Sequence, residues 1–438
     1  MNWFKPTPRL AIIIALIINV WTSSNMNFGG ENWRSIISSD ACGYYAYLPA
    51  IFIYKDLQFS QFEHVEKSPL YYSDYLTQDY RTKTETGIVD KYYVGCAVLW
   101  SPFFAIAHFL AEPLGYPSDG YSKPYHIAIC WAAIFYLALG MYCLAKLLQK
   151  VGYSDSSIFW ALLLTEFASN LFYYSVPLPS FSHVYSFCAI SMFLYFGQKT
   201  LIGQKWWDWI WTAILIGIIT LIRPINIIAV VFLPFFFDNW PVFWSSIKRI
   251  TVSNWTISFL TFTCVIFIQL IIYKIQTGQF LVYSYEGEGF DFLHPNLWGY
   301  LFGFRKGFFV YTPIFLPVLL TSVFVLWKTN RYKLFTLMLP IYLVWHIAAS
   351  WWCWWYGNGY SQRPMVDFMF ILSLLVCIGF DYFHKYQKVL AMVFVVFIII
   401  TQIQTYQARY GLILPDMMTK ELYIQEFLNI SNIIERTK

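Results

Sequence analysis

Long apolar segments follow one another along the whole chain of 438 residues, and they restrict what it can fold into. Hydrophobic residues make up 58% of the chain, and charged residues only 12%. A soluble protein of this length cannot bury such a large apolar fraction, whereas a lipid bilayer solvates it. The composition therefore predicts an all-α, polytopic transmembrane protein.

The lengths of the apolar segments and the positions of the basic residues predict a topology. A membrane helix needs about 20 apolar residues, and short cytoplasmic loops collect Lys and Arg. We predict about 11 spans, at residues 8–24, 124–146, 157–176, 183–198, 207–222, 224–238, 251–273, 308–327, 334–350, 364–381 and 389–405. With the N-terminus inside, every second turn is basic, through Lys146, Lys150, Lys199, Lys205, Lys248, Arg249, Lys328, Arg331, Lys333, Lys385 and Lys388.

Two further apolar stretches, 43–54 and 94–111, are predicted to be juxtamembrane helices in the outer leaflet. A pair of crossings is the alternative. Between them lies a polar external loop of about 40 residues, long enough to be functional. We expect residues 1–405 to form one integral membrane domain and 406–438 a short external C-terminal tail. A signal peptide at 1–24 is the weaker interpretation, because no small-x-small cleavage site follows it.

Several classes of function are disfavoured. The net charge of +5 comes from basic residues placed in ones and twos at the ends of apolar segments, which indicates topology and not nucleic-acid binding. No Walker, Rossmann, zinc or Gly-x-Ser-x-Gly motif is present. The eight cysteines form no CxxC pair and are expected to be packing thiols, with a Cys42–Cys96 disulfide as the alternative.

Asp40 is a carboxylate placed close to the predicted outer surface of the bilayer, in the segment that follows the first span. It precedes Ala41-Cys42-Gly43-Tyr44-Tyr45-Ala46-Tyr47 and lies in reach of both lipid headgroups and water. We interpret it as a general base, or as a ligand for a divalent cation, Mg²⁺ or Mn²⁺. The alternative is a helix N-cap without a catalytic role.

The segment from Ser350 to Pro364 is the most specific composition signal. It combines four tryptophans, two glycines, Tyr356, Tyr360 and Arg363 in one external turn. An aromatic belt explains the tryptophans but not the glycines and the arginine. Aromatic faces stack on pyranose rings and a guanidinium clamps phosphate, so we expect a sugar-phosphate site that includes Trp354 and Trp355.

Other polar residues on the predicted external face are candidates for substrate binding, each with a simpler alternative. Arg223 faces an aqueous cavity or a headgroup, or else anchors a helix break at Pro224. Arg305 and Lys306 break the positive-inside pattern, either to bind an anionic headgroup or to snorkel. The remaining candidates are Lys91 (or a surface lysine), His183 (or a satisfied interfacial histidine) and Glu286, whose spacing is weak evidence for a metal site.

Together these residues resemble bacterial GT-C glycosyltransferases, polytopic relatives of protein O-mannosyltransferases and of the aminoarabinose transferase of lipid A. The elements that carry the resemblance are Asp40 with Tyr44-Tyr45-Ala46-Tyr47-Leu48-Pro49-Ala50, Lys91-Tyr92-Tyr93-Val94-Gly95 before Leu99-Trp100-Ser101-Pro102, Arg223-Pro224, Arg305-Lys306-Gly307 through Tyr311-Thr312-Pro313, and the Trp-rich turn ending at Arg363. They cover most of the chain, although their spacing is not strict.

The resemblance implies a transferase that uses a polyprenyl-phosphate-linked sugar, with Asp40 at the position of the catalytic aspartate. An acceptor on a glycan, lipid or protein would displace the lipid phosphate directly, with inversion. We expect Tyr44 and Tyr45 to contact substrate, and Arg305, Arg363, Lys91 or Arg223 to hold the phosphate. The enzyme would lie in the inner (plasma) membrane with its site on the periplasmic face.

Two departures weaken the resemblance. The second external loop offers only Ser180, Ser182 and His183 where many relatives have an acid, and the tail is too short for a separate periplasmic domain. A lipid-linked sugar flippase, or a glycan polymerase or ligase, therefore remains the alternative. A flippase would be expected to show inverted repeats, and the sequence shows no internal repeat.

Overall fold

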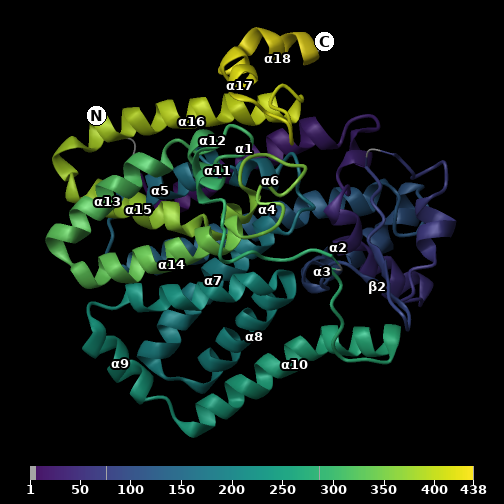
Figure 1. The fold of residues 1–438 in the computed structure, drawn as a ribbon, viewed down its shortest axis with the longest axis horizontal. Helices are drawn as coiled ribbons and strands as arrows, with labels where there is room; N and C mark the ends of the chain where they lie inside the picture. Colours follow the sequence, from purple (N-terminus) through teal and green to yellow (C-terminus); the bar gives the residue numbers. More distant parts are fainter. Residues whose placement is uncertain (1–5, 75, 286, 438) are drawn as a thin grey trace.

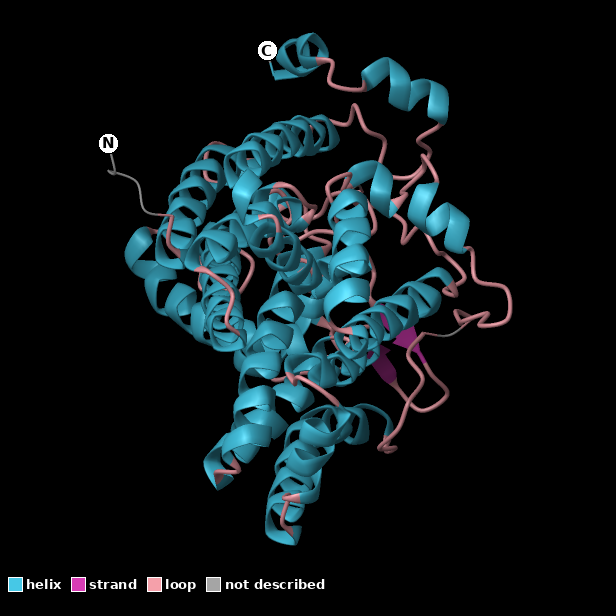
Figure 2. Ribbon diagram, turned by 90° about the vertical axis from the view of Figure 1, so that its left-hand side faces the viewer, coloured by secondary structure: helices cyan, strands magenta, loops and turns pink. Residues whose placement is uncertain are grey.

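The computed structural model describes residues 6–74, 76–285 and 287–437, and helices make up most of it (Figures 1 and 2). The described part contains one sheet, a two-stranded antiparallel ribbon of β1 (Arg81–Lys83) and β2 (Ile88–Asp90). It lies in the first long loop, at the right-hand end of Figure 1. The prediction of an all-α architecture is confirmed.

Helices occupy every segment that was predicted to span the membrane. In the first half these are α1 (Pro8–Asn27), α4 (Lys123–Val151), α5 (Asp155–Phe167), α6 (Leu171–Ser175), α7 (His183–Gly203) and α8 (Trp206–Ile222). In the second half they are η5 (Pro224–Phe236), α9 (Trp240–Lys248), α10 (Val252–Thr277), α12 (Phe308–Tyr311), α13 (Phe315–Thr329), α14 (Arg331–Ala349), α15 (Phe370–Tyr382) and α16 (Gln387–Arg409). Short helices cover the loops: η1 (Asn32–Ser35), η3 (Phe62–Glu66), η4 (Glu112–Leu114), α11 (Leu297–Phe302), η6 (Arg363–Phe368) and η7 (His384–Tyr386).

Six of the described helices are long and apolar enough to cross a membrane, or seven if η5 and α9, bent by 115°, form one broken span. The predicted count of about 11 is larger because several predicted segments are interrupted. Pro224 begins a 3₁₀ helix after the extended residue Arg223, and Thr312-Pro313 separates α12 from α13. Proline removes an amide donor and disfavours helical backbone in the residue before it, which explains both breaks.

The two juxtamembrane stretches behave differently from each other. The first forms α2 (Asp40–Pro49) and the π-helical turn η2 (Ala50–Tyr54). Every α2 residue from Ala41 to Pro49 is buried, so α2 packs inside the protein and not with one face on the lipid surface. The second forms α3 (Gly95–Ala111), which continues into η4 and is long enough to span. All eight cysteines are free.

Loops that were predicted to lie outside the membrane contact one another. Lys91 in the first loop pairs with Glu288 at 2.5 Å, and Arg305 pairs with Asp416 in the tail at 2.6 Å. Asp40 reaches across to the Trp-rich turn, as described below. These loops therefore form one end of the helix bundle.

Turns that were predicted to be cytoplasmic also contact one another. The carboxylate of Asp381 accepts from the Ser154 amide at 2.9 Å, and Asp238 lies 3.3 Å from Lys333. This separation into two ends agrees with the alternation predicted from the basic residues. Beyond the bundle, α16 ends at Arg409, and α17 (Lys420–Glu426) and α18 (Ile430–Thr437) lie over it at the top of Figure 1. The domain boundary at 405 remains a prediction.

Candidate active site

Asp40 and Arg363 form an ion pair at the loop end of the bundle, although 323 residues separate them. Arg363 Nη1 donates to Asp40 Oδ2 at 2.6 Å, and the Tyr92 hydroxyl donates to Oδ1 at 3.0 Å. The Asp40 side chain keeps 17% of its surface exposed and that of Arg363 15%. The two predicted site residues are therefore in direct contact, and part of each side chain remains exposed.

The backbone around Asp40 is strained and closely packed. Ser39 has φ 55° and ψ −131°, a conformation that non-glycine residues rarely adopt, and its amide donates to the Leu76 carbonyl at 2.8 Å. A Cβ on Gly43 would lie 2.4 Å from Tyr92 Cδ2. Gly43 therefore lets the segment that carries Tyr92 approach α2, which brings its hydroxyl to Asp40. The carboxylate of Asp40 does not cap α2, because both of its oxygens are bonded outside that helix.

Arg363 follows a turn that only small residues allow. Gly359 has φ +137°, and a Cβ there would lie 2.6 Å from the Tyr174 hydroxyl. That hydroxyl donates to the Tyr360 carbonyl and accepts from the Tyr360 amide, both at 3.0 Å. The guanidinium of Arg363 also lies 5.5 Å from the centre of the Phe181 ring. The turn thus directs Arg363 back towards α2.

A second polar cluster joins α7, the break after α8, and η6. His183 Nδ1 lies 2.6 Å from Asp367 Oδ1, and Asn226 donates to Asp367 Oδ2 at 2.8 Å. Arg223 Nε lies 3.7 Å from the same carboxylate. His183 and Asp367 are each 1% exposed, whereas Arg223 keeps 20%. Arg223 is therefore the member of this cluster that a ligand can reach.

Lys306 is a buried cation next to Arg363. It is 2% exposed, and its ammonium donates to the Gly359 carbonyl. Burial, then repulsion by Arg363, lowers the pKa of Lys306 to about 7. Arg305 has its own partner, Asp416, and its guanidinium lies over Trp355 at 3.7 Å. Among the described residues, Lys306 pairs with no carboxylate whereas Arg305 does, so the charge of Lys306 adds to that of Arg363 although the side chain itself is enclosed.

The protonation state of Asp40 depends on Arg363. Burial by itself would raise the pKa of Asp40, but the Arg363 guanidinium and the Tyr92 hydroxyl outweigh it, and the pKa is lowered. Burial would lower the pKa of Arg363, yet Asp40 raises it above its ordinary value. Asp40 is therefore a carboxylate, and a weak base, for as long as Arg363 stays on it.

The structure brings some of the other predicted residues to this site and places others further away. Tyr44 packs on Tyr92 with ring centres 4.7 Å apart, so it lies beside Asp40. Tyr45 points elsewhere, because its hydroxyl donates to the Gly120 carbonyl at 2.5 Å. Lys91 is held by Glu288. Glu286 lies outside the described residues.

Most aromatic side chains of the Trp-rich turn are buried or contact other residues of the protein. Tyr356 donates to the Ala348 carbonyl at 2.9 Å, and Tyr360 is 1% exposed. Trp354 and Trp355 contact each other edge to face at 5.7 Å, and a Cβ on Gly299 would lie 2.8 Å from Trp354. Of these four, Trp355 is placed beside a cation of the loop end, Arg305.

Sequence reasoning missed Asp367, Asn226 and Tyr92 as site residues. Asp367 had a usable signal, since a carboxylate within an apolar segment and four residues after Arg363 is rare without a function. Tyr92 lies beside the lysine that was selected, Lys91, and nothing in the sequence relates it to Asp40. That contact depends on the fold of the long first loop.

The described side chains at this site do not form a binding site for a divalent cation. Among the described residues, no group of three or more His, Cys, Asp or Glu side chains is placed to hold a metal ion. The two oxygens of Asp40 accept from Tyr92 and Arg363, and those of Asp367 accept from His183 and Asn226. The nearby cations would also repel a metal ion.

No protein-family model matches the chain. No curated protein matches it in sequence. Among solved structures, matches include three of an oligosaccharyltransferase from Archaeoglobus fulgidus, which share 10–12% identity with this chain at a TM-score of 0.46. One, named AglB, contains an inhibitory peptide and a dolichol-phosphate and aligns with 93% of this chain and 55% of its own. The apo form covers 94% and 56%, and the complex with Zn and sulfate 91% and 53%. The chain thus spans about half the length of these structures.

Proposed function

We propose that this protein is a membrane glycosyltransferase of the GT-C type, which transfers a sugar from a polyprenyl-phosphate donor to an acceptor at the loop end of its helix bundle. The observation that carries the proposal is the accessible Asp40–Arg363 pair with Arg223 and Lys306 nearby. A carboxylate beside several cations, at the end of a membrane bundle, suits proton abstraction next to a departing phosphate.

In the proposed reaction, an acceptor hydroxyl attacks the anomeric carbon from the face opposite the phosphate. The bond between that carbon and the phosphate oxygen breaks, its electron pair stays on the phosphate, and the acceptor proton goes to Asp40. The configuration at the anomeric carbon is inverted, and no covalent enzyme intermediate is needed. Arg363, Arg223 and Lys306 stabilise the charge on the leaving phosphate in a partly dehydrated site, where such contacts are stronger than in water.

Donor binding would activate the base. Arg363 is the strongest of the contacts that lower the pKa of Asp40. A phosphate that takes over the planar N–H groups of Arg363 removes that contact, so the carboxylate is released and becomes more basic. Asp40 would therefore be a strong base only while a donor is bound.

The proposal assigns different parts to the other predicted residues. Arg305 and Lys91 already have carboxylate partners, so we assign them to holding the external loops together and to outer contacts with the headgroup. His183 donates to Asp367, and the Asp367 carboxylate, 3.7 Å from Arg223 Nε, keeps Arg223 in place. The proposal also places the enzyme in the inner membrane, with this site on the periplasmic face.

The test is turnover by the purified protein in detergent. A panel of polyprenyl-phosphate sugars and hydroxyl acceptors should yield free polyprenyl phosphate and a glycosylated product, because the chemistry needs no sealed compartment. The Asp40→Asn variant should give neither. A flippase would leave donor and acceptor covalently unchanged in detergent and move donor only across sealed liposomes, and that pair of results would overturn the proposal.

A further inference from the structure

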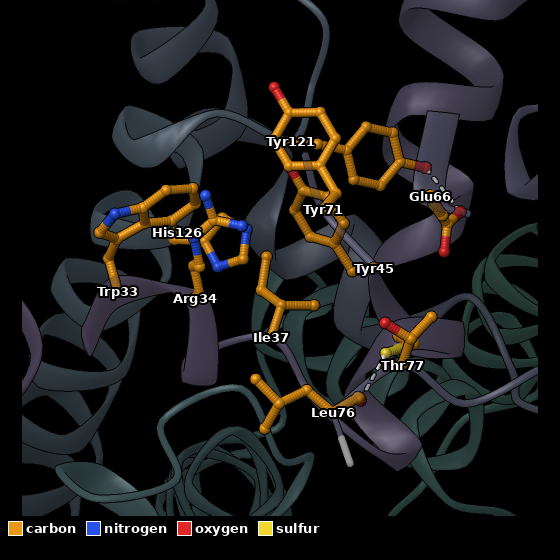
Figure 3. Close-up of a pocket in the computed structure, with 11 residues that line it drawn as sticks. Trp33, Arg34, Ile37, Tyr45, Glu66, Tyr71, Leu76, Thr77, Tyr121 and His126 are labelled. Carbon is orange, nitrogen blue, oxygen red and sulfur yellow. Dashed lines mark hydrogen bonds between the residues drawn. The ribbon is translucent and has the colours of Figure 1, made fainter. Parts of the chain in front are cut away.

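A small cavity lies between the first loop, α2 and the start of α4 (Figure 3). Its volume is about 50 Å³. Figure 3 shows Trp33, Arg34 and His126 at one side and Glu66 at the other, with tyrosine rings between them. The cavity is also lined by Ile37, Cys42, Leu76 and Thr77.

Two polar side chains at the cavity are almost completely buried. Glu66 and His126 are each 7% exposed. Oε1 of Glu66 accepts from the hydroxyls of Tyr80 and Tyr121 at 2.7 and 2.8 Å. Nδ1 of His126 makes no hydrogen bond of good geometry among the described residues, although backbone groups of Trp33 and Tyr121 lie near the imidazole. A buried polar atom without a partner is costly, and a ligand hydroxyl would satisfy it.

The charge at the cavity favours an uncharged ligand. The Arg34 guanidinium is already neutralised by Glu31 at 2.5 Å and also donates to the Leu70 carbonyl. Burial raises the pKa of Glu66 to about 7, so near neutral pH it is about half protonated and can donate as well as accept. An anion would meet the Glu66 carboxylate, and a divalent cation would find no second carboxylate in the lining.

The shape and lining fit the edge of a sugar. Aromatic faces from Trp33, Tyr45, Tyr71 and Tyr121 accommodate C–H groups, while Glu66 and His126 reach hydroxyls. A cavity of about 50 Å³ holds roughly three or four water molecules, so a hydroxymethyl group and its neighbours would enter, and a complete ring would not.

The cavity is close to the proposed base along α2. Asp40 begins the helix, and Cys42 and Tyr45 line the cavity. With a rise of about 1.5 Å per residue, the two sites are roughly 3–8 Å apart along the axis. Residues 42 and 45 lie on a different face of α2 from residue 40, so the width of the helix adds to this axial offset.

We infer that this cavity is a subsite for the hydroxyl-bearing edge of a neutral sugar unit of the substrate. The inference rests on the proposed function for its role. A neutral sugar could belong to a glycan acceptor or to a donor with more than one sugar. The experiment must therefore separate ligand binding from catalysis, and acceptor from donor.

Binding is tested on full-length Asp40→Asn protein in nanodiscs, which requires no turnover. Saturation-transfer NMR with methyl glucoside, galactoside and mannoside should detect at least one of these neutral sugars, and methyl glucuronide and glucosamine only weakly. Ile37→Trp fills the cavity without removing a hydrogen bond and should weaken binding at least tenfold. Leu70→Trp is the matched control, because Leu70 lies in the same loop, is 52% exposed and does not line the cavity.

A second measurement covers the case in which Ile37→Trp fails to fold. In a Cys264→Ser background, which removes the exposed native cysteine, Thr77→Cys should react with a thiol reagent more slowly when the bound methyl glycoside is present. Equal binding by Ile37→Trp and Leu70→Trp, preference for the charged sugars, or no protection at Thr77→Cys would each overturn the subsite.

Kinetics with the otherwise native protein identify the source of the sugar. A KM raised at least tenfold by Ile37→Trp for the acceptor alone assigns the cavity to the acceptor, and one raised for the donor alone assigns it to the donor. If glycosides bind but neither KM changes by more than twofold, the cavity does not serve the reaction and the inference is wrong. Binding of the methyl glycosides without any turnover would contradict the proposed function. It would not contradict the binding site.

Discussion

Replacing Asp40 by Asn should have opposite effects on chemistry and on donor binding. Asn keeps an oxygen for the Tyr92 hydroxyl, now 3.0 Å from Oδ1, but removes the charge that holds Arg363. Without a base, turnover should fall by about 10² or more. The binding of a lipid phosphate should become tighter, because the phosphate no longer competes with a carboxylate for Arg363.

The gain in affinity can be estimated from the contact that the phosphate must displace. A hydrogen bond to a charged group contributes about 1.5–3 kcal/mol. The Asp40 and Arg363 side chains retain 17% and 15% exposure, so water already screens part of this interaction. We therefore take the lower value, about 1.5 kcal/mol, which corresponds to about tenfold tighter binding.

Titration calorimetry of a short-chain polyprenyl phosphate into protein in nanodiscs measures this affinity. Asp238→Asn is the control, since Asp238 pairs with Lys333 at the opposite end of the bundle, and it should change neither affinity nor turnover by more than about twofold. Weaker binding by Asp40→Asn would mean that Asp40 helps to hold the phosphate. Turnover within a few-fold of the native protein would reduce Asp40 to a structural partner of Arg363.

Four other predictions address the surrounding residues. Arg363→Lys should lower kcat/KM for the donor about tenfold or more despite the retained charge, because an ammonium lacks the planar pair of N–H groups that binds phosphate. Equal activity would contradict phosphate binding by Arg363. Gly43→Ala should lower turnover, because the new Cβ would lie 2.4 Å from Tyr92 and displace it. Gly29→Ala is the control, since a Cβ there has no atom within 4 Å, and it should leave turnover unchanged. Equal effects of the two variants would show that the Gly43–Tyr92 contact is unimportant. Donor affinity should fall as pH rises through about 7, because Lys306 loses its proton there. The Lys306→Met protein should bind donor more weakly, with an affinity that does not change across that range. A native affinity that does not fall would exclude Lys306 from the phosphate site. In a Cys264→Ser background, impermeant thiol reagents should label Leu70→Cys and Leu293→Cys from outside but not Ile202→Cys, and labelling of the last position would invert the topology.

The architecture could be predicted because the bilayer imposes it on the sequence. Segments such as 251–273 and 389–405 need only length and apolar composition to be recognised, and helices α10 and α16 cover them. The breaks were harder to predict. Segment 224–238 reads as one apolar run, and only the backbone shows a 3₁₀ helix followed by a bend of 115°.

The candidate site was predictable in composition but not in its pairing. Asp40 and Arg363 were both selected, as base and phosphate ligand, from their positions next to apolar segments. Their contact at 2.6 Å joins residues 323 apart and depends on how the first loop folds over the bundle. The role of Asp367 as the partner of His183 depends in the same way on tertiary packing, which short-range patterns in the sequence do not record.

A cryo-electron microscopy structure of the Asp40→Asn protein with a polyprenyl-phosphate sugar would show where the donor binds. We expect a phosphate within hydrogen-bond distance of Arg363 and close to Arg223 and Lys306. We also expect the anomeric carbon to lie beside residue 40, with the face opposite the phosphate open to an acceptor. A donor bound with its phosphate away from Arg363, or with the sugar remote from residue 40, would contradict the assignment of this site.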